Sequence, residues 1–320
     1  MSRPLSFLLF AVLTALRSAA TAQPASILQL NPGQPDLHVD MEIDVRLQEV
    51  FVNVGSEAER LSRDDFTILD DGVPQTIVTF EHGDVPFTAV LLLDASLSMQ
   101  SGRLDTAVGG ARSFVHAMNR LDEAKLLLFA DRILVETPFT SVPSILTLGL
   151  SDVEAQGGTA LNDALYLGIK RLDDRLGRKV VVLLSDGVDV ESVLPMEMVR
   201  DVARRSQAVL YWLRLRRPEE AKDAPLQELF TAWRNAEGHR REMDELRAAV
   251  LESGGRVDGL DRVEDVPAAL ALILQELRGQ YVLGYSPSVH HGAGAWHKIA
   301  VRVRGAPGGR VRVQEGYVEK

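Results

Sequence analysis

The sequence predicts an α/β fold in which a doubly wound, mostly parallel sheet is inserted into a small β-sandwich formed by the N- and C-terminal segments. Three observations predict it: continuous apolar runs in the middle of the chain, helical apolar spacing between these runs, and alternation of apolar and polar residues near both ends. Continuous apolar runs are typical of parallel strands covered on both faces, whereas alternation is typical of strands with one solvated face.

The first 22 residues have the pattern of a secretory signal peptide. Arg3 gives a positive start, Leu5–Leu16 is an apolar run, and Ala20-Thr21-Ala22 offers small residues for cleavage. Because this run is too short to span a membrane comfortably, we expect no stable membrane span after cleavage. An uncleaved anchor or a buried first helix is the alternative, since Arg17 lies close to the cleavage site. We expect a secreted or periplasmic protein of a bacterial envelope.

Residues 23–37 are expected to form a linker, and residues 38–84 the first part of the β-sandwich. The strand signals there are, in order, Met41–Leu47, Val50–Val54, and a hairpin of Phe66–Leu69 and Thr76–Phe80 joined by the turn signal Asp70-Asp71-Gly72. Strand-forming residues bounded by turn signals of this kind predict antiparallel β-structure.

Residues 85–279 are predicted to form the domain with the parallel sheet. Its buried strands are expected at Ala89–Leu93, Leu126–Phe129, Val180–Leu184 and Ala208–Trp212. Between them, apolar residues recur at helical spacing, as at Leu104, Val108, Ala111, Val115 and Met118. The β-α-β-α order favours a doubly wound sheet. Residues 217–245 are charged and helix-prone, and we expect them to form a helical excursion from this domain.

Residues 280–320 return to strand patterns and are expected to complete the β-sandwich. Tyr281–Tyr285 is a strand signal, Lys298–Arg304 alternates between charged and apolar residues, and Val311 and Val313 follow. Three strands are not stable alone, and neither are the few at the N-terminus, so we expect the two groups to pair.

Composition excludes several classes of function. The chain has 320 residues with 45 acidic and 35 basic side chains, a formal charge of −10, so a nucleic-acid partner is not expected. It has no Cys, which excludes disulfides, thiolate zinc sites and a cysteine nucleophile. Any bound metal must therefore take oxygen or imidazole ligands.

Polar residues gather where the predicted parallel strands end. Asp94-Ala95-Ser96-Leu97-Ser98 follows the first buried strand, Gly157-Gly158-Thr159 precedes a predicted helix, and Ser185-Asp186-Gly187 ends a later strand. Open α/β sheets bind ligands at the carboxyl ends of their strands. We therefore expect the side-chain oxygens of Asp94, Ser96, Ser98, Thr159 and Asp186 to converge on one site.

This set of motifs resembles the von Willebrand factor A family, whose metal-ion-dependent adhesion site has the pattern D-x-S-x-S, then T, then D. The resemblance implies a Rossmann-like domain over residues 85–279. It also implies a first ligand loop with Asp94, Ser96 and Ser98, a second with Thr159 and a third with Asp186. The flanking segments are similar to those of bacterial secreted proteins related to this family.

Carboxylates and hydroxyls are hard oxygen donors, so Mg²⁺ or Mn²⁺ is expected at this site in preference to Zn²⁺ or Cu²⁺, with Ca²⁺ less favoured because it demands more ligands. Two carboxylates balance one dication, and a water on the ion can be exchanged for an incoming carboxylate. We therefore expect a non-enzymatic protein-binding or adhesion module whose partner supplies an Asp or Glu. The sequence does not determine the partner, the biological process or the oligomeric state.

Two other functions stay open at this stage: a metal-dependent hydrolase, and a structural envelope protein with a vestigial site. No G-x-S-x-G, H-E-x-x-H, G-x-G-x-x-G or Walker A pattern occurs, which disfavours the common hydrolases and nucleotide-binding enzymes. His290-His291 could bind a metal, although an exposed pair of this kind is usually only solvated.

Overall fold

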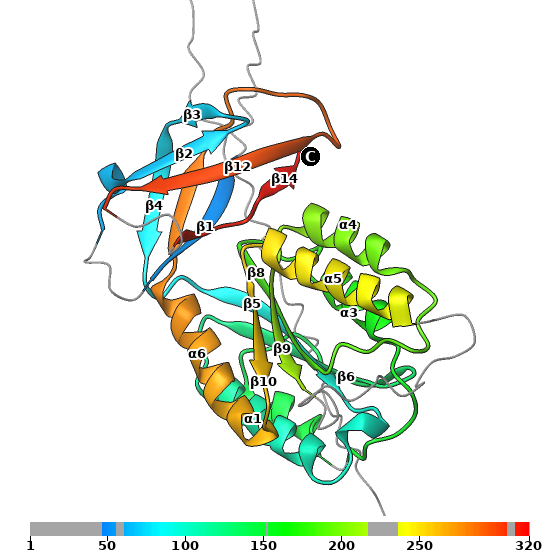
Figure 1. Ribbon diagram of the computed structural model, residues 1–320. Helices are drawn as coiled ribbons and strands as arrows, with labels where there is room; N and C mark the ends of the chain where they lie inside the picture. Colours follow the sequence, from blue (N-terminus) through cyan, green and yellow to red (C-terminus); the bar gives the residue numbers. More distant parts are fainter. Residues whose placement is uncertain (1–46, 56–60, 152, 217–235, 306–310, 320) are drawn as a thin grey trace, which may run out of the picture. The chain divides into compact units, whose positions relative to one another are not determined.

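The computed structural model describes residues 47–55, 61–151, 153–216, 236–305 and 311–319 (Figure 1). The predicted signal peptide and linker lie outside these residues, as do residues 38–46 of the predicted sandwich. Within the described part of the chain, no helix combines the length and apolarity that a membrane crossing requires.

A six-stranded sheet forms the centre of the segment that the sequence predicts to be α/β. Its strands, in sheet order, are β10 (Arg256–Leu260), β9 (Val209–Leu215), β8 (Arg178–Ser185), β5 (Phe87–Asp94), β6 (Glu123–Phe129) and β7 (Ile133–Glu136). All neighbours are parallel except β6 and β7. Every residue of β5 and β8 is buried, as expected for central strands covered on both faces. The edge strands β7 and β10 are short and only partly buried.

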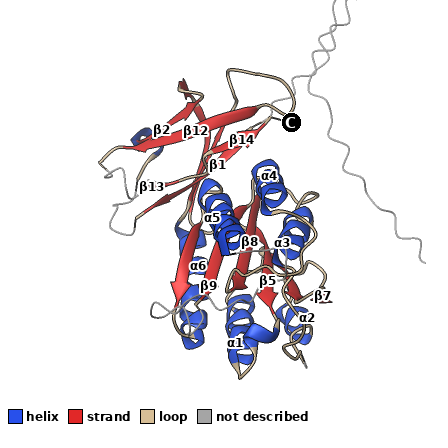
Figure 2. Cartoon of the chain, turned by 45° about the vertical axis from the view of Figure 1, so that its right-hand side comes forward, coloured by secondary structure: helices blue, strands red, loops and turns tan. Residues whose placement is uncertain are grey.

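Helices cover both faces of this sheet (Figures 1 and 2). One face carries α1 (Arg103–His116) and α6 (Val266–Gly279), with α2 (Pro143–Leu148) packed beside α1; the other carries α3 (Leu161–Lys170), α4 (Met196–Ser206) and α5 (Ala236–Glu252). The predicted helix face at Leu104, Ala111 and Val115 is buried in the first of these layers. Two apolar cores, one on each side, therefore hold the sheet between its helices.

The remaining strands form two antiparallel sheets of four strands each. Their orders are β13-β1-β11-β4 and β14-β12-β2-β3. The bounds are β1 (Gln48–Val54), β2 (Phe66–Asp70), β3 (Val73–Gln75), β4 (Ile77–His82), β11 (Tyr281–Tyr285), β12 (Trp296–Val303), β13 (Val311–Arg312) and β14 (Gly316–Val318). N-terminal strands pair with C-terminal ones in both sheets, β1 with β11 and β2 with β12. The fold class that the sequence predicts is thus confirmed.

The predicted hairpin differs from the observed one in its second strand. The turn at Asp71 and Gly72 has positive φ at both residues, +48° and +82°, and joins β2 to the three-residue β3. Pro74 lies in β3, which is an edge strand, where its missing N–H breaks no ladder bond. The chain then crosses to the other sheet, where β4 pairs with β11. The predicted pairing of Thr76–Phe80 with Phe66–Leu69 is therefore wrong, because most of this segment lies in β4, which pairs with β11.

The predicted helical excursion at residues 217–245 is only partly described. Residues 217–235, which include Trp233, lie outside the described part of the chain. From Ala236 the chain forms α5, whose buried Leu246, Ala249 and Val250 pack on the same face of the sheet as α3 and α4. The end of the charged segment is thus a covering helix of the sheet.

Candidate metal-binding site at the sheet switch point

The two central strands of the parallel sheet, β5 and β8, lie side by side, and their connections lead toward opposite edges of the sheet. After β5 it continues to β6, and after β8 it continues to β9 on the other side. Asp94 is the last residue of β5, and Asp186 directly follows the last residue of β8. Such a switch in strand order leaves a crevice between diverging loops, the place where open α/β sheets bind ligands. The predicted carboxylates therefore lie at the position that favours a site.

The first predicted ligand loop is held in place by the Asp94 carboxylate. The backbone N–H of Ser96 donates a hydrogen bond to Asp94 Oδ1 at 2.9 Å, and the hydroxyl oxygens of Ser96 and Ser98 lie 3.0 Å apart. Asp94 is fully buried and Ser96 nearly so, whereas Ser98 is partly exposed. Arg103 donates to the carbonyl of Ser98 at 3.2 Å and so fixes the end of the loop. The loop thus presents one carboxylate and two hydroxyls together, with Ser98 toward solvent.

The third predicted loop is joined to the first through Ser185. Its hydroxyl donates to Asp94 Oδ2 at 2.7 Å and accepts a hydrogen bond from the N–H of Gly187 at 3.1 Å. Asp186 is buried, and its Oδ1 accepts from the N–H of Val188 at 2.9 Å. Sequence reasoning gave Ser185 no role; its position at the end of the strand beside Asp94 is the signal that could have found it.

The sharp exit after Asp186 requires glycine at the next position. Gly187 has a φ of +86°, and a Cβ atom there would lie 2.2 Å from the ring of Trp212. The Trp212 ring is itself buried, and its N–H donates to the carbonyl of Ser185 at 3.1 Å. The backbone at Asp186 is therefore held between a hydrogen bond and a close ring contact, as the Gly in the sequence motif suggests.

The second predicted loop is tied by its backbone to both of the others. The N–H of Gln156 donates to the carbonyl of Ala95 at 2.8 Å, and that of Leu97 to Gly157 at 3.2 Å. The carbonyl of Thr159 accepts from Val190 at 2.9 Å. These bonds place the Thr159 loop against the other two loops, and Thr159 is buried. The side-chain contacts described above join Asp94, Ser96, Ser98 and Ser185, while the link to Thr159 runs through the backbone.

The two buried carboxylates repel each other. Burial and the charge of Asp186 together raise the pKa of Asp94 to about 6, although hydrogen bonds from Ser96 and Ser185 oppose the rise. Two negative charges held together inside the protein are unfavourable unless a positive charge lies between them. Carboxylate and hydroxyl oxygens are the ligands that Mg²⁺ and Mn²⁺ prefer, so the residues present fit a divalent cation.

Three further carboxylates near the loops have structural contacts or face solvent. Asp163 accepts hydrogen bonds from the N–H groups of Val193 and Leu194 at 3.0 and 2.9 Å. Asp189 accepts from the N–H of Leu161, the first residue of α3, at 2.9 Å. Asp105 is exposed. Asp189 is buried, and its carboxylate stabilises the N-terminus of α3.

A comparison with family descriptions finds one match, to the von Willebrand factor type A domain, over residues 89–188. This range contains all five predicted ligands, and the resemblance predicted from the motifs is confirmed. A search of the curated proteins finds no significant match.

Solved structures similar to this chain include an aerotolerance-related membrane protein from Bacteroides fragilis, with 20% identity and a TM-score of 0.45 over 60% of this chain and 98% of the other. BatB from Bacteroides thetaiotaomicron matches with 18% identity and a TM-score of 0.44 over 60% and 97%. Proximal thread matrix protein 1 from the mussel byssus, solved with a zinc-occupied MIDAS motif, has 15% identity and a TM-score of 0.46 over 65% and 49%.

Proposed function

Because residues 89–188 carry a von Willebrand factor type A domain, we propose that the chain is a protein-binding module that depends on a divalent cation. The ion is Mg²⁺ or Mn²⁺, and its proposed ligands are Asp94, Ser96, Ser98, Thr159 and Asp186. The ion takes up an acidic side chain from a protein partner. We further propose that the protein acts in the bacterial envelope, secreted or periplasmic, and has no enzymatic turnover.

The observation that supports this proposal is the position of two buried carboxylates, Asp94 and Asp186, at the ends of neighbouring strands at the sheet switch point. Asp94 and Asp186 together balance the charge of one dication, and the Ser96 and Ser98 hydroxyls lie 3.0 Å apart on the loop that follows Asp94. An octahedral ion held in this way keeps positions for water. Exchange of one such water for a partner carboxylate needs no other change in the site.

The surroundings of the ligand loop favour a protein partner. Leu97, between the two serines, is 52% exposed, so an apolar side chain adjoins the partly exposed Ser98. An apolar contact beside a charged one is the usual composition of a protein interface. The chain as a whole carries a charge of −10, so an acidic partner group is repelled unless the ion supplies a local positive charge. Binding should therefore depend strictly on the metal.

The first test is the titration of the full chain with Mg²⁺ and with Mn²⁺ by calorimetry. We expect one site per chain in the wild type and none in Asp186→Ala. The matched control is Asp105→Asn, which removes an exposed carboxylate on α1 and should leave binding unchanged. Equal Mg²⁺ affinity in wild type and Asp186→Ala would contradict the assignment of the site.

The second test addresses the partner and the competing functions. A pulldown from envelope extract should recover a partner in Mg²⁺ but not in EDTA, and not with Asp186→Ala as bait. Multiple product molecules formed per chain, and lost in Asp94→Ala, would favour the hydrolase instead. Indifference to both the chelator and the substitution would favour a structural role.

A further inference from the structure

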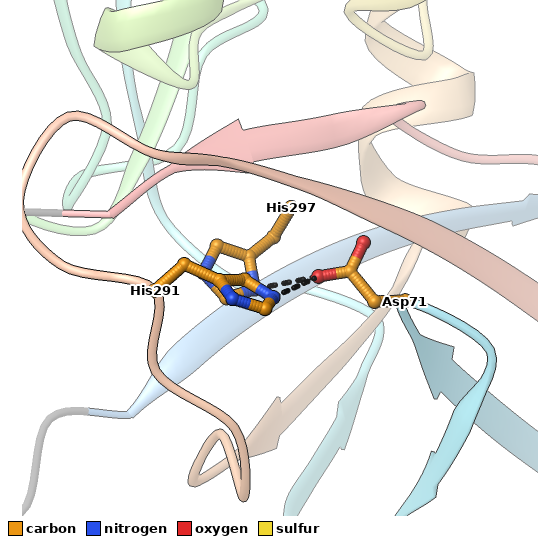
Figure 3. Close-up of side chains that lie close together, drawn as sticks. All are labelled: Asp71, His291 and His297. Carbon is orange, nitrogen blue, oxygen red and sulfur yellow. Dashed lines mark hydrogen bonds and ion pairs between the residues drawn. The ribbon is translucent and has the colours of Figure 1, made fainter.

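A second group of metal-binding side chains lies in the antiparallel sheets, on elements that contribute nothing to the site on the parallel sheet. Asp71 is in the turn between β2 and β3, His291 is in the loop between β11 and β12, and His297 is on β12 (Figure 3). One ligand atom from each residue lies within 4.8 Å of those of the other two. The three side chains come from segments far apart in the sequence, so their meeting is a product of the fold.

Two of the three separations between ligand atoms in this cluster suit a small metal ion, and the third is within 4.8 Å. Asp71 Oδ2 lies 3.1 Å from Nδ1 of His297 and 3.2 Å from Nε2 of His291. In a tetrahedral zinc site with bonds of about 2.0–2.1 Å, neighbouring ligand atoms are about 3.3 Å apart. The two nitrogens thus approach one carboxylate oxygen at the spacing that ligands of one ion adopt.

The Asp71 carboxylate is oriented by the backbone. Its Oδ1 accepts a hydrogen bond from the N–H of Lys298 at 2.8 Å, which leaves Oδ2 directed at the two imidazoles. The side chain of His291 is 48% exposed and that of Asp71 is 30% exposed, which gives an ion a path from solvent.

His297 is oriented from its other ring nitrogen. Its Nε2 lies 3.2 Å from Glu319 Oε2, and Glu319 is itself held by the N–H groups of His291 and Gly292, each at 2.8 Å. A metal-binding histidine typically donates its second N–H to a carboxylate in this way, which fixes the tautomer. With its proton on Nε2, His297 presents a lone pair on Nδ1 toward Asp71.

That lone pair faces negative charge. Besides Asp71, the buried Asp70 places Oδ1 3.2 Å from His297 Nδ1, while its Oδ2 accepts hydrogen bonds from the hydroxyls of Tyr285 and Tyr317. The position therefore attracts a cation, and the second imidazole beside it favours a metal over a proton.

We propose that Asp71, His291 and His297 bind one transition-metal dication of the zinc type. Two imidazole nitrogens and one carboxylate favour Zn²⁺, Cu²⁺ or Ni²⁺ over Mg²⁺, which prefers oxygen ligands alone. Water or Asp70 Oδ1 completes the coordination. The ion joins the loop between β11 and β12 to the turn between β2 and β3, so it stabilises the antiparallel sheets.

The test uses the full chain with Asp186→Ala in the background, so that the site on the parallel sheet does not contribute. Zn²⁺ binding is measured by competition with a chromophoric chelator, and Co²⁺ is used as a spectroscopic probe of the ligands. We expect one Zn²⁺ per chain and, on His291→Ala, a loss of affinity of about tenfold or more. Excess Mg²⁺ should not displace the Zn²⁺.

The matched control is His290→Ala. His290 adjoins His291 and is 68% exposed, but its Nδ1 lies against Glu319 Oε1 at 2.8 Å rather than against Asp71. We expect His290→Ala to retain Zn²⁺ affinity within about twofold, and Asp71→Asn to lose it as His291→Ala does. Unchanged melting temperatures of His290→Ala and His291→Ala in EDTA check that both variants fold. Equal losses in the two histidine variants, or no loss in His291→Ala, would overturn the proposal.

Discussion

Replacement of Asp94 by Asn should make the metal-free protein more stable while removing its response to Mg²⁺. Asp94 is fully buried at the end of β5, and burial and the neighbouring Asp186 both oppose its ionisation. Asn has nearly the same shape: its oxygen can accept from Ser96, and its amide can donate to the Ser185 hydroxyl, which reverses the direction of that hydrogen bond. The substitution therefore removes the charge and little else.

The magnitude follows from the pKa of Asp94. A rise from 3.8 to about 6 corresponds to about 3 kcal/mol of folding free energy, at about 1.4 kcal/mol for each tenfold change in the protonation equilibrium. Below pH 3.8 the side chain is protonated in both the folded and the unfolded chain, so the penalty is absent. As the pH rises, the unfolded chain releases the proton first, and the penalty is complete above about pH 6.

The assay is denaturant unfolding of wild type and Asp94→Asn in EDTA at pH 7.5 and at pH 5. At pH 7.5 the variant should be more stable by up to about 3 kcal/mol, and the difference should shrink at pH 5. Mg²⁺ should then stabilise the wild type but not the variant. Asp105→Asn serves as the control: its exposed carboxylate lies in the first turn of α1, so its loss should cost no more than about 1 kcal/mol. The reasoning is refuted if Asp94→Asn is no more stable than wild type in EDTA at pH 7.5.

Two further predictions concern the glycine turn after Asp186 and the hydrogen bond between Tyr285 and Asp70. Gly187→Ala places a Cβ against Trp212 at a φ of +86°, so it should lower stability by more than about 1 kcal/mol and should also lower Mg²⁺ affinity. The control is Gly177→Ala, at a φ of +72° with nothing within 4 Å, which should lower stability alone. Equal effects of the two on Mg²⁺ binding, measured by calorimetry, would be inconsistent with a role for the Gly187 turn. Tyr285→Phe removes a hydroxyl that donates to the buried Asp70 at 2.8 Å and should cost about 1–3 kcal/mol in denaturant unfolding. A loss below about 0.5 kcal/mol would show that Asp70 does not depend on this hydrogen bond.

The architecture was predictable because its signals are local: buried parallel strands read as continuous apolar runs. The D-x-S-x-S motif likewise places the three proposed ligands of the first loop within five residues, at the end of one such run. The hydroxyl of Ser185 was missed because its contact, Asp94, lies on another strand. The second strand of the β2–β3 hairpin was misassigned for a related reason: apolar alternation identifies a strand but not the sheet that receives it.

The proximity of Asp71, His291 and His297 could not be predicted from the sequence. His291 is visible in the sequence beside His290, but Asp71, whose carboxylate contacts the His291 ring, is 220 residues away. What brings them together is the register of β2 against β12, in which Asp70 pairs with Ile299 and the N–H of Asp71 donates to the carbonyl of Lys298 at 2.8 Å. A slip of one residue in this register would turn His297 to the opposite face of the sheet and remove its buried nitrogen from the group. The cluster is thus a property of strand pairing, and a metal bound there would stabilise that register against its alternatives. The repulsion between Asp94 and Asp186 has a more local origin, because it follows from two buried aspartates at the ends of adjacent strands.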